Sequence, residues 1–316
     1  MTPIVETEQL TRSYGGQVAL DSLTLSIPEG AIFGFIGPNG AGKTTTMRIL
    51  TTLLRPTSGD ARVAGLSVTR QGADVRRVVG FMPDSFGMYA GTRAWEYLDF
   101  FGRAYRVPPA RRTVLIDELL ALVDLSHKRD AMVMSLSRGM KQRLSLARAM
   151  IHDPRLLILD EPASGLDPRA RIELRELLKE LSALGKTIMI SSHILTELAE
   201  MCTHIAIIER GHLLAAGDVS TILRSLQPHR RIEIRALAGG TIAAELLADA
   251  AGVHEIQHAT TGEGAGIATL TFDHTGDDAA LADLLAALVG AGVRVARFAE
   301  LSSDLEDIFM QVTRGG

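Results

Sequence analysis

The sequence predicts an α/β protein that carries a small α+β domain at its C-terminal end. Short apolar runs, each of strand length, alternate with segments that have the apolar spacing of helices. One long stretch, residues 86–153, carries only the helical pattern. A change in composition at residues 227–231 separates this region from the second domain. Strands that alternate with helices favour a largely parallel sheet, into which residues 86–153 form a helical insertion.

The first part of the chain is expected to begin with β structure. Residues 23–27 alternate between apolar and polar side chains, as a half-buried strand does, and residues 28–30 form a turn. Residues 31–36 are a continuous apolar run, which is consistent with a strand buried on both faces. A glycine-rich turn follows, and residues 43–54 are expected to form a helix that Pro56 ends.

Strands and helices are then expected to alternate, after two helices within the insertion. The expected helices are residues 113–125, 140–151 and 169–184, and the expected strands are residues 156–159, 187–190 and 205–208. Pro154 ends the second of these helices because proline cannot continue the hydrogen-bond ladder. Gly185 follows the third helix and is a suitable cap for its C-terminus.

The remaining elements predict a separate accessory domain. We expect a first domain over residues 1–226, a linker at 227–231 and a second domain over 232–316. The expected order is β (232–236), α (242–250), β (253–257), β (267–272), α (279–289) and β (293–298). That order matches the split βαβ arrangement of ferredoxin-like domains. A last helix is expected from Ser303, because Glu306 stands where a capping box places its acid.

The bulk composition excludes several classes of protein. Of the 316 residues, 46% are hydrophobic and 22% are charged, which is ordinary for a globular chain. The formal net charge of −4 gives no basic field for nucleic acid, so no nucleic-acid partner is expected. Cys202 is the only cysteine, so no internal disulfide is possible. No run approaches the about 18 apolar residues of a membrane-spanning helix, and the N-terminus does not look like a signal peptide.

A glycine-rich segment predicts a phosphate-binding loop. It fits the pattern G-x-x-x-x-G-K-[ST], and it lies between an apolar strand and a helix. Its glycines let backbone N–H groups converge on phosphate oxygens at the positive end of the helix dipole. The candidate ATP-binding residues are Gly37, Pro38, Asn39, Gly40, Ala41, Gly42, Lys43, Thr44 and Thr45. This motif alone does not decide between a kinase, a GTPase and an ATPase.

Two adjacent carboxylates, Asp160 and Glu161, follow the apolar run at residues 156–159. In a phosphate-loop protein a carboxylate at the end of a neighbouring strand completes the Mg²⁺ site, and Asp160 suits that role. Glu161 can then accept a proton from an attacking water. Taken without the loop, the pair fits a solvated turn equally well. His193 follows another strand, and by itself it is more typical of a capping or surface residue.

Together these residues resemble the ATP-binding cassette of ABC transporters. The resemblance covers about residues 4–225 and rests on the order and spacing of several motifs. These are residues 37–45, residues 136–143, Asp160 with Glu161, residues 164–167, and His193. It implies a P-loop NTPase fold whose mixed sheet carries an antiparallel β subdomain and a helical subdomain at about 86–153.

The resemblance implies a role for each matching residue of the ATP site. Lys43 and Thr44 are expected to hold the phosphates and Mg²⁺, and Asp160 to complete the metal site. Glu161 is expected to be the catalytic base. His193 is expected to be the switch residue that contacts the γ-phosphate. The implied reaction is hydrolysis of ATP to ADP and phosphate, coupled to transport.

A second group of residues resembles the signature of these cassettes. Ser137, Arg138, Gly139 and Met140 stand where the commoner sequence is Ser-Gly-Gly-Gln, and Asp167 lies in the loop that crosses to the partner cassette. In the family the signature caps ATP held by the opposite subunit. Ser137 also precedes an expected helix, so its hydroxyl and the helix N-terminus make a second anion site. The chain has one loop and one signature, which predicts a head-to-tail dimer on ATP.

Two further positions are compared with the family pattern. Tyr14 stands where an aromatic side chain stacks on adenine. Asp84 stands where the family usually has a glutamine that contacts Mg²⁺ and signals to the membrane partner. Aspartate is also a hard oxygen ligand, so a metal contact can survive. It is one methylene shorter, and it adds negative charge near the two carboxylates of the site.

The implied partners are an integral-membrane permease on a separate chain and a second cassette, either a copy of this one or a relative. Residues 303–309 resemble the end of cassettes from exporters of antibiotics, lipids or sodium. The expected location is therefore the cytoplasmic face of the membrane. The alternatives are a soluble cassette ATPase that acts on nucleic acid or the ribosome, and a module whose tail senses a small molecule. The sequence does not name the transported substrate.

Overall fold

The computed structural model describes residues 3–85, 87, 89, 91–226, 230–260 and 267–301, and the chain divides into two compact units. The first unit is Met1–Ile222 and the second is Leu223–Gly316. The division falls four residues before the boundary expected at residue 226, within helix α8 (Val219–Leu226).

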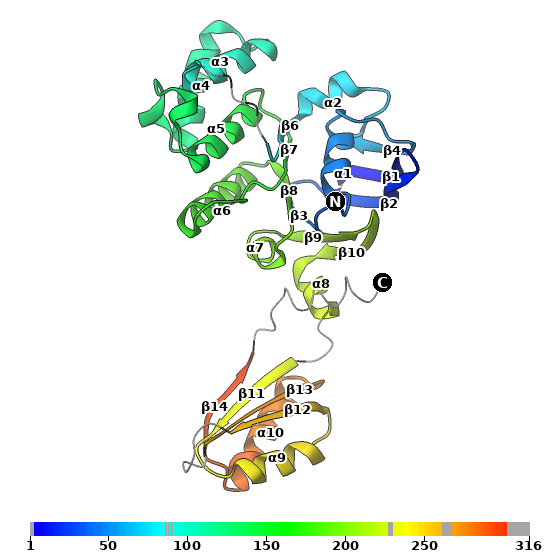
Figure 1. The fold of residues 1–316 in the computed structure, drawn as a ribbon, viewed down its shortest axis with the longest axis vertical. Helices are drawn as coiled ribbons and strands as arrows, with labels where there is room; N and C mark the ends of the chain where they lie inside the picture. Colours follow the sequence, from blue (N-terminus) through cyan, green and yellow to red (C-terminus); the bar gives the residue numbers. More distant parts are fainter. Residues whose placement is uncertain are drawn as a thin grey trace. The chain divides into compact units, whose positions relative to one another are not determined.

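The N-terminal part of the first unit is an antiparallel β subdomain (Figure 1). Its strand order is β2-β1-β4-β5, with β1 (Pro3–Tyr14), β2 (Gln17–Pro28), β4 (Ser58–Val63) and β5 (Leu66–Ser67). The sequence predicted only residues 23–27 of this sheet. The sequence pattern did not predict strand β1, because its register against β2 shifts several times and these shifts interrupt the alternation of apolar and polar side chains.

The central sheet of the first unit has the order β10-β9-β3-β8-β7-β6. Its strands are β3 (Ile32–Ile36), β6 (Val79–Met82), β7 (Leu156–Leu159), β8 (Thr187–Ser192), β9 (His204–Glu209) and β10 (His212–Asp218). All neighbours are parallel except β9 and β10, which are antiparallel. Every residue of β3, β7 and β8 is buried, as the continuous apolar runs predicted. The carboxyl ends of these parallel strands therefore meet at one edge of the sheet.

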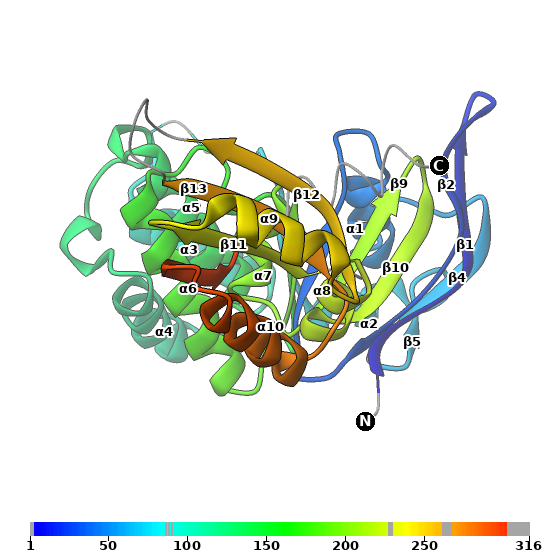
Figure 2. The same ribbon diagram turned by 90° about the horizontal axis from the view of Figure 1, so that it is seen from below.

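Helices connect and cover these strands. They are α1 (Lys43–Leu50), α2 (Gly72–Val78), α3 (Ala94–Ala104), α4 (Pro109–Leu122), α5 (Arg138–Met150), α6 (Pro168–Ala183) and α7 (Leu195–Ala199). Short 3₁₀ turns lie at Ser126–Lys128 and Val133–Ser135. Helix α1 ends four residues earlier than expected, since Thr51 closes it and Thr52 takes a left-handed φ of 63°. Figures 1 and 2 show α3, α4 and α5 grouped on the side of the central sheet away from β1, β2 and β4.

No helix within the described residues has the length and apolar character required to cross a membrane.

The second unit contains a four-stranded antiparallel sheet of order β12-β13-β11-β14. Its elements are β11 (Arg230–Ala236), α9 (Gly240–Asp249), β12 (Val253–Thr260), β13 (Ala268–His274), α10 (Asp278–Gly290) and β14 (Val295–Glu300). This element order and strand order are those of a ferredoxin-like domain. Figure 2 shows α9 and α10 on the same face of the sheet, where Leu247 and Leu288 join a core with Ile234 and Phe272.

Part of the expected linker is strand. Arg230 and Arg231 belong to β11, and the Arg230 guanidinium lies 2.6 Å from Glu300 and 2.7 Å from Asp278. The two arginines looked like a charged linker because these partners are distant in sequence. The helix expected from Ser303, and the exporter-like residues 303–309, lie outside the described residues.

Candidate functional site

The glycine-rich segment forms a loop between β3 and α1, so it lies at the carboxyl edge of the central sheet. Gly42 precedes α1 with a φ of 112°, a left-handed conformation that glycine adopts without strain. A Cβ at this position would lie 2.8 Å from the carbonyl oxygen of Ala19. Within the described residues no side chain caps α1, so the N–H groups of its first turn are left for a group bound in the loop. This geometry suits phosphate.

Lys43 is the first residue of α1, and its side chain is only 6% exposed. Its Nζ donates hydrogen bonds to the carbonyl oxygens of Gly37, at 2.5 Å, and Pro38, at 3.3 Å. It also lies 3.5 Å from Oε1 of Glu161. Burial lowers the pKa of Lys43, and the negative charge of Glu161 opposes that shift. The ammonium is therefore confined to the loop by oxygen atoms on two sides.

Asp160 directly follows β7, and its side chain is 2% exposed. The hydroxyl of Thr44 donates to Oδ2 of Asp160 at 2.9 Å, and the hydroxyl of Ser191 donates to Oδ1 at 2.6 Å. Both carboxylate oxygens thus have a partner, as a buried charge requires. Thr44 belongs to α1 and Ser191 to β8, so three elements fix one carboxylate beside the loop.

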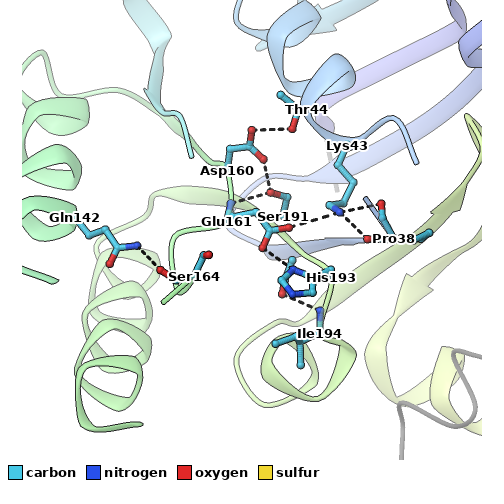
Figure 3. A network of polar contacts seen from close by, with 12 residues as sticks. Pro38, Lys43, Thr44, Gln142, Asp160, Glu161, Ser164, Ser191, His193 and Ile194 are labelled. Carbon is cyan, nitrogen blue, oxygen red and sulfur yellow. Dashed lines mark hydrogen bonds and ion pairs between the residues drawn. The ribbon is translucent and has the colours of Figure 1, made fainter. Parts of the chain in front are cut away.

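Glu161 extends from the next position toward both Lys43 and His193 (Figure 3). Its backbone has a φ of 51°, which is uncommon for a residue with a side chain and costs on the order of 1 kcal/mol. The hydroxyl of Ser191 accepts the Glu161 N–H at 2.9 Å and stabilises this conformation. Oε2 of Glu161 lies 3.0 Å from Nδ1 of His193, which follows β8 by one residue. A carboxylate and an imidazole in contact can share a proton.

Ser191 is one of two contact residues that the sequence did not predict. It is fully buried, and its one hydroxyl contacts the side chain of Asp160 and the backbone of Glu161. The available signal was a pair of serines at the end of an apolar strand, just before His193. Gln142 was also missed; its amide donates to the carbonyl oxygen of Ser164 at 3.1 Å and links α5 to the loop after Glu161.

The signature residues lie at the start of α5, outside the network of Figure 3. Ser137 caps α5, since its hydroxyl accepts the N–H of Met140 at 3.3 Å. Asp167 caps α6 in the same way, accepting the N–H of Ala170 at 2.9 Å. Both termini open onto a hollow of about 570 Å³, which Arg138 and Gly139 also line. Charged side chains of both signs line it, among them Arg143, Arg169 and Glu173.

Two expected site residues lie apart from this network. Tyr14 ends β1, is 45% exposed, and has the guanidinium of Arg12 at 4.5 Å from its ring centre. Asp84 is exposed and follows β6, whose Met82 is paired with Leu159 of β7. The amide of Asp160 donates to the carbonyl oxygen of Met82 at 2.8 Å. The backbone two residues before Asp84 therefore contacts Asp160, the expected metal ligand. The roles of Tyr14 and Asp84 stay predictions.

The ABC transporter family profile matches residues 20–164, which hold the loop, the signature and the two carboxylates. Over 317 aligned residues the chain is 34% identical to the bacitracin transport ATP-binding protein BcrA of Bacillus licheniformis, covering 100% of this chain and 99% of that protein. The chain belongs to the ABC transporter ATP-binding proteins. It is an ATP-binding, ATP-hydrolysing cassette of this family.

Further relatives agree with this assignment. The Nod factor export ATP-binding protein I of Cupriavidus metallidurans is 38% identical over 225 residues, which cover 71% of this cassette protein and 74% of the relative. A solved ATP-binding subunit of an ABC transporter superposes with a TM-score of 0.64 at 30% identity, covering 70% of this chain and 92% of that one. CbiO1 of Clostridium perfringens, part of an ABC transporter complex, gives a TM-score of 0.65 at 26% identity, covering 71% and 91%. These relatives are transport proteins, so the alternative of a nucleic-acid or ribosome ATPase is not supported.

Proposed function

We propose that this cassette hydrolyses ATP between two head-to-tail copies, or between itself and a related cassette, and so powers export through a separate permease. The observation that carries the proposal is the position of Glu161. One carboxylate oxygen lies 3.0 Å from His193 Nδ1 and the other lies 3.5 Å from Lys43 Nζ. A base is thus held between a cation that attracts phosphate and an imidazole that can orient it.

The residues around Asp160 fit a magnesium ion. Thr44 and Asp160 place two oxygen atoms 2.9 Å apart at the N-terminus of α1, and Mg²⁺ prefers oxygen ligands. Among the described residues no cluster of three or more His, Cys, Asp or Glu side chains could hold a metal. The remaining ligands would then be phosphate oxygens and water, as is usual for Mg²⁺ bound with a nucleotide. When bound, the ion neutralises charge on the phosphates. Asp84 is proposed as a further ligand and as the residue that couples the site to the permease.

The chain's own residues account for the chemistry. Lys43 and the N–H groups of α1 hold the β- and γ-phosphates. Because a phosphate carries more negative charge than Glu161, it draws the ammonium toward itself and leaves Glu161 to accept a proton from the attacking water. His193 then holds the other oxygen of Glu161 and reaches the γ-phosphate. Tyr14 is proposed to stack on the adenine ring.

The partners follow from the relatives. Two of these relatives are named for the export of Nod factor and the transport of bacitracin. We propose that this cassette likewise acts from the cytoplasmic face of a membrane, bound to an integral permease on another chain. Ser137 and Gly139 are proposed to close the ATP site of the opposite cassette, and Asp167 to contact that cassette across the interface.

The test of this proposal is Glu161→Gln. Loss of the base should lower the turnover number for ATP by about 100-fold or more, the range for removing a general base. The variant should still bind ATP with Mg²⁺ and should accumulate as a dimer, measured by size-exclusion chromatography with light scattering. Glu176→Gln is the matched control, because this glutamate is 56% exposed on α6 and far along the helix from the loop. A variant that stays monomeric at saturating ATP with Mg²⁺ would contradict the dimeric site.

A further inference from the structure

The ring of Tyr14 lies near the phosphate loop, on the hairpin that joins β1 and β2. Tyr14 is paired with Gln17 across the turn. Two residues after Gln17, the carbonyl oxygen of Ala19 is the atom that a Cβ on Gly42 would meet at 2.8 Å. Because two strand residues span about 7 Å, the hairpin brings the ring close to the loop. The base of a nucleotide whose phosphates are bound at the loop is therefore within reach of Tyr14.

The guanidinium of Arg12 covers one face of this ring. Its central carbon lies 4.5 Å from the ring centre, which is within the range of a cation–π interaction. Arg12 and Tyr14 are two residues apart on β1, and side chains at this spacing project from the same face of a strand. Tyr14 is nevertheless 45% exposed. The face of the ring opposite Arg12 is thus the one that a ligand can contact.

Arg12 is held in place from the segment that follows α1. Its Nη1 donates to the carbonyl oxygen of Arg55 at 3.2 Å, and the N–H of the neighbouring Ser13 donates to the hydroxyl of Thr57 at 3.0 Å. The Nε of Arg12 is buried and, among the residues that the structure describes, has no hydrogen-bond partner. A guanidinium that leaves a buried N–H unpaired is placed by its flat face, which stacks on Tyr14, as well as by its hydrogen bonds. These contacts fix the ring relative to the helix that begins at the phosphate loop.

We propose that Arg12 is a positioning residue for the base of the nucleotide, and that it holds the ring of Tyr14 so that its free face stacks on a purine. The inference rests on the proposed function, in which Tyr14 contacts adenine. A cation on one face of an aromatic ring draws electron density from the other face, which then repels the π electrons of a stacked base less. A purine has two fused rings and a pyrimidine has one, so this support favours adenine nucleotides over pyrimidine nucleotides.

The experiment measures dissociation constants on the full-length chain with Mg²⁺ by isothermal titration calorimetry. The ligands are ADP, CDP and inorganic pyrophosphate, which carry no γ-phosphate and so separate binding to one chain from hydrolysis. Arg12→Met keeps an apolar stem and removes the charge, and it should weaken ADP by about threefold to fivefold, the size of a cation–π contact. CDP should be weakened less. Pyrophosphate should stay within about twofold, because Lys43 and the loop are unchanged. Arg12→Lys keeps a cation over the ring and should recover most of the affinity for ADP.

A double-mutant cycle separates the proposed role from a structural one. Tyr14→Ala removes the ring and should weaken ADP by about tenfold, as expected for the loss of one stacked base. Because Arg12 acts through the ring, the double variant Arg12→Met/Tyr14→Ala should bind ADP as weakly as Tyr14→Ala alone. A merely structural role of Arg12 would instead add its own loss to that of Tyr14→Ala.

Arg62→Met is the matched control, because Arg62 is exposed on β4 of the same sheet. It should leave all three dissociation constants within about twofold. An unchanged affinity of Arg12→Met for ADP, equal losses for ADP and pyrophosphate, or additive losses in the double variant would overturn the inference. If Tyr14→Ala binds ADP as the parent does, the proposed contact of Tyr14 with adenine fails and this inference fails with it. The hydrolytic site that Glu161→Gln tests would then still stand.

Discussion

Helices α1 and α5 both begin at a proposed phosphate contact, but their N-termini are built differently. Helix α1 begins after Gly42, has no side-chain cap, and starts with a lysine that is 6% exposed. Helix α5 begins after Ser137, whose hydroxyl accepts an N–H of its own helix. One terminus leaves its orphan N–H groups for a ligand, whereas the other satisfies one of them internally. Ser137 keeps its own O–H hydrogen, which it can donate outward.

This difference implies a division of work between the two helices. The terminus of α1 combines several free N–H groups with a buried cation, so it should bind ATP in a single chain. The terminus of α5 offers one hydroxyl and the exposed cation of Arg138, which salt screens, so it should contribute only when a second cassette brings a phosphate to it. Three substitutions test this division, taken from the largest expected effect to the smallest.

Lys43→Ala should have the largest effect. Removing the buried ammonium takes away a charge-assisted contact to phosphate, so the single-chain affinity for ATP should fall by about 100-fold or more. Isothermal titration calorimetry measures this affinity directly. The control is Lys141→Ala in the first turn of α5, which should leave the affinity within about twofold. Equal losses for the two variants would show that the termini do not differ as described.

Gly42→Ala should lower stability more than Gly139→Ala, which makes the analogous change near the start of α5. Residue 42 has a left-handed φ, and a Cβ there would lie 2.8 Å from a carbonyl oxygen. A Cβ at position 139 would contact the side chain of Leu166 at 3.3 Å. The first change should cost about 2 kcal/mol of unfolding free energy, or a Tm lower by about 4–8 °C. Differential scanning calorimetry without nucleotide checks this. A Gly139→Ala protein that melts at the lower temperature would reverse the comparison.

Ser137→Ala should have the smallest effect on the free chain. Loss of the cap should cost about 1 kcal/mol, and Ser137→Asp should restore that stability because aspartate also caps helices well. The aspartate would repel a phosphate, so ATP-driven dimerisation in the Glu161→Gln background should stay weak in both variants. Thermal melting and sedimentation separate the two roles. If the aspartate variant dimerised normally, Ser137 would be only a cap.

The sequence alone predicted the parts of the fold that have uninterrupted patterns. The buried strands β3, β7 and β8 were visible as apolar runs, and the spacing of glycines and Lys43 located the phosphate loop. Most of the antiparallel subdomain was not visible. Strand β1 contains Gln9 at a φ of 45°, and its register shifts near that residue break the period of two that identifies a strand.

The candidate site was predicted residue by residue, but its geometry was not. The sequence indicated Asp160 and Glu161 as a pair, and resemblance supplied the role of His193. The contact of 3.0 Å between Glu161 and His193 depends on the left-handed backbone of Glu161 and on the buried hydroxyl of Ser191. Neither feature follows from the local sequence pattern. Residues 230 and 231 were assigned to the linker for the same reason, because the contacts that identify them as strand are distant in sequence. Arg230 is recognisable as a strand residue only once Glu300, far along the chain, lies beside it.

The ends of the ferredoxin-like unit have a mechanical consequence. Strand β11 begins at Arg230 and β14 ends at Glu300, and the two are antiparallel neighbours with Ile232 opposite Glu300. The N–H of Leu301 donates to the carbonyl oxygen of Arg231 at 2.8 Å, so the chain enters and leaves this unit at one corner. A pull between residues 230 and 301 would load the bonds of this ladder one after another, since they lie across the strands. The unit should therefore unzip from that corner at low force, beginning with the Arg230–Glu300 ion pair.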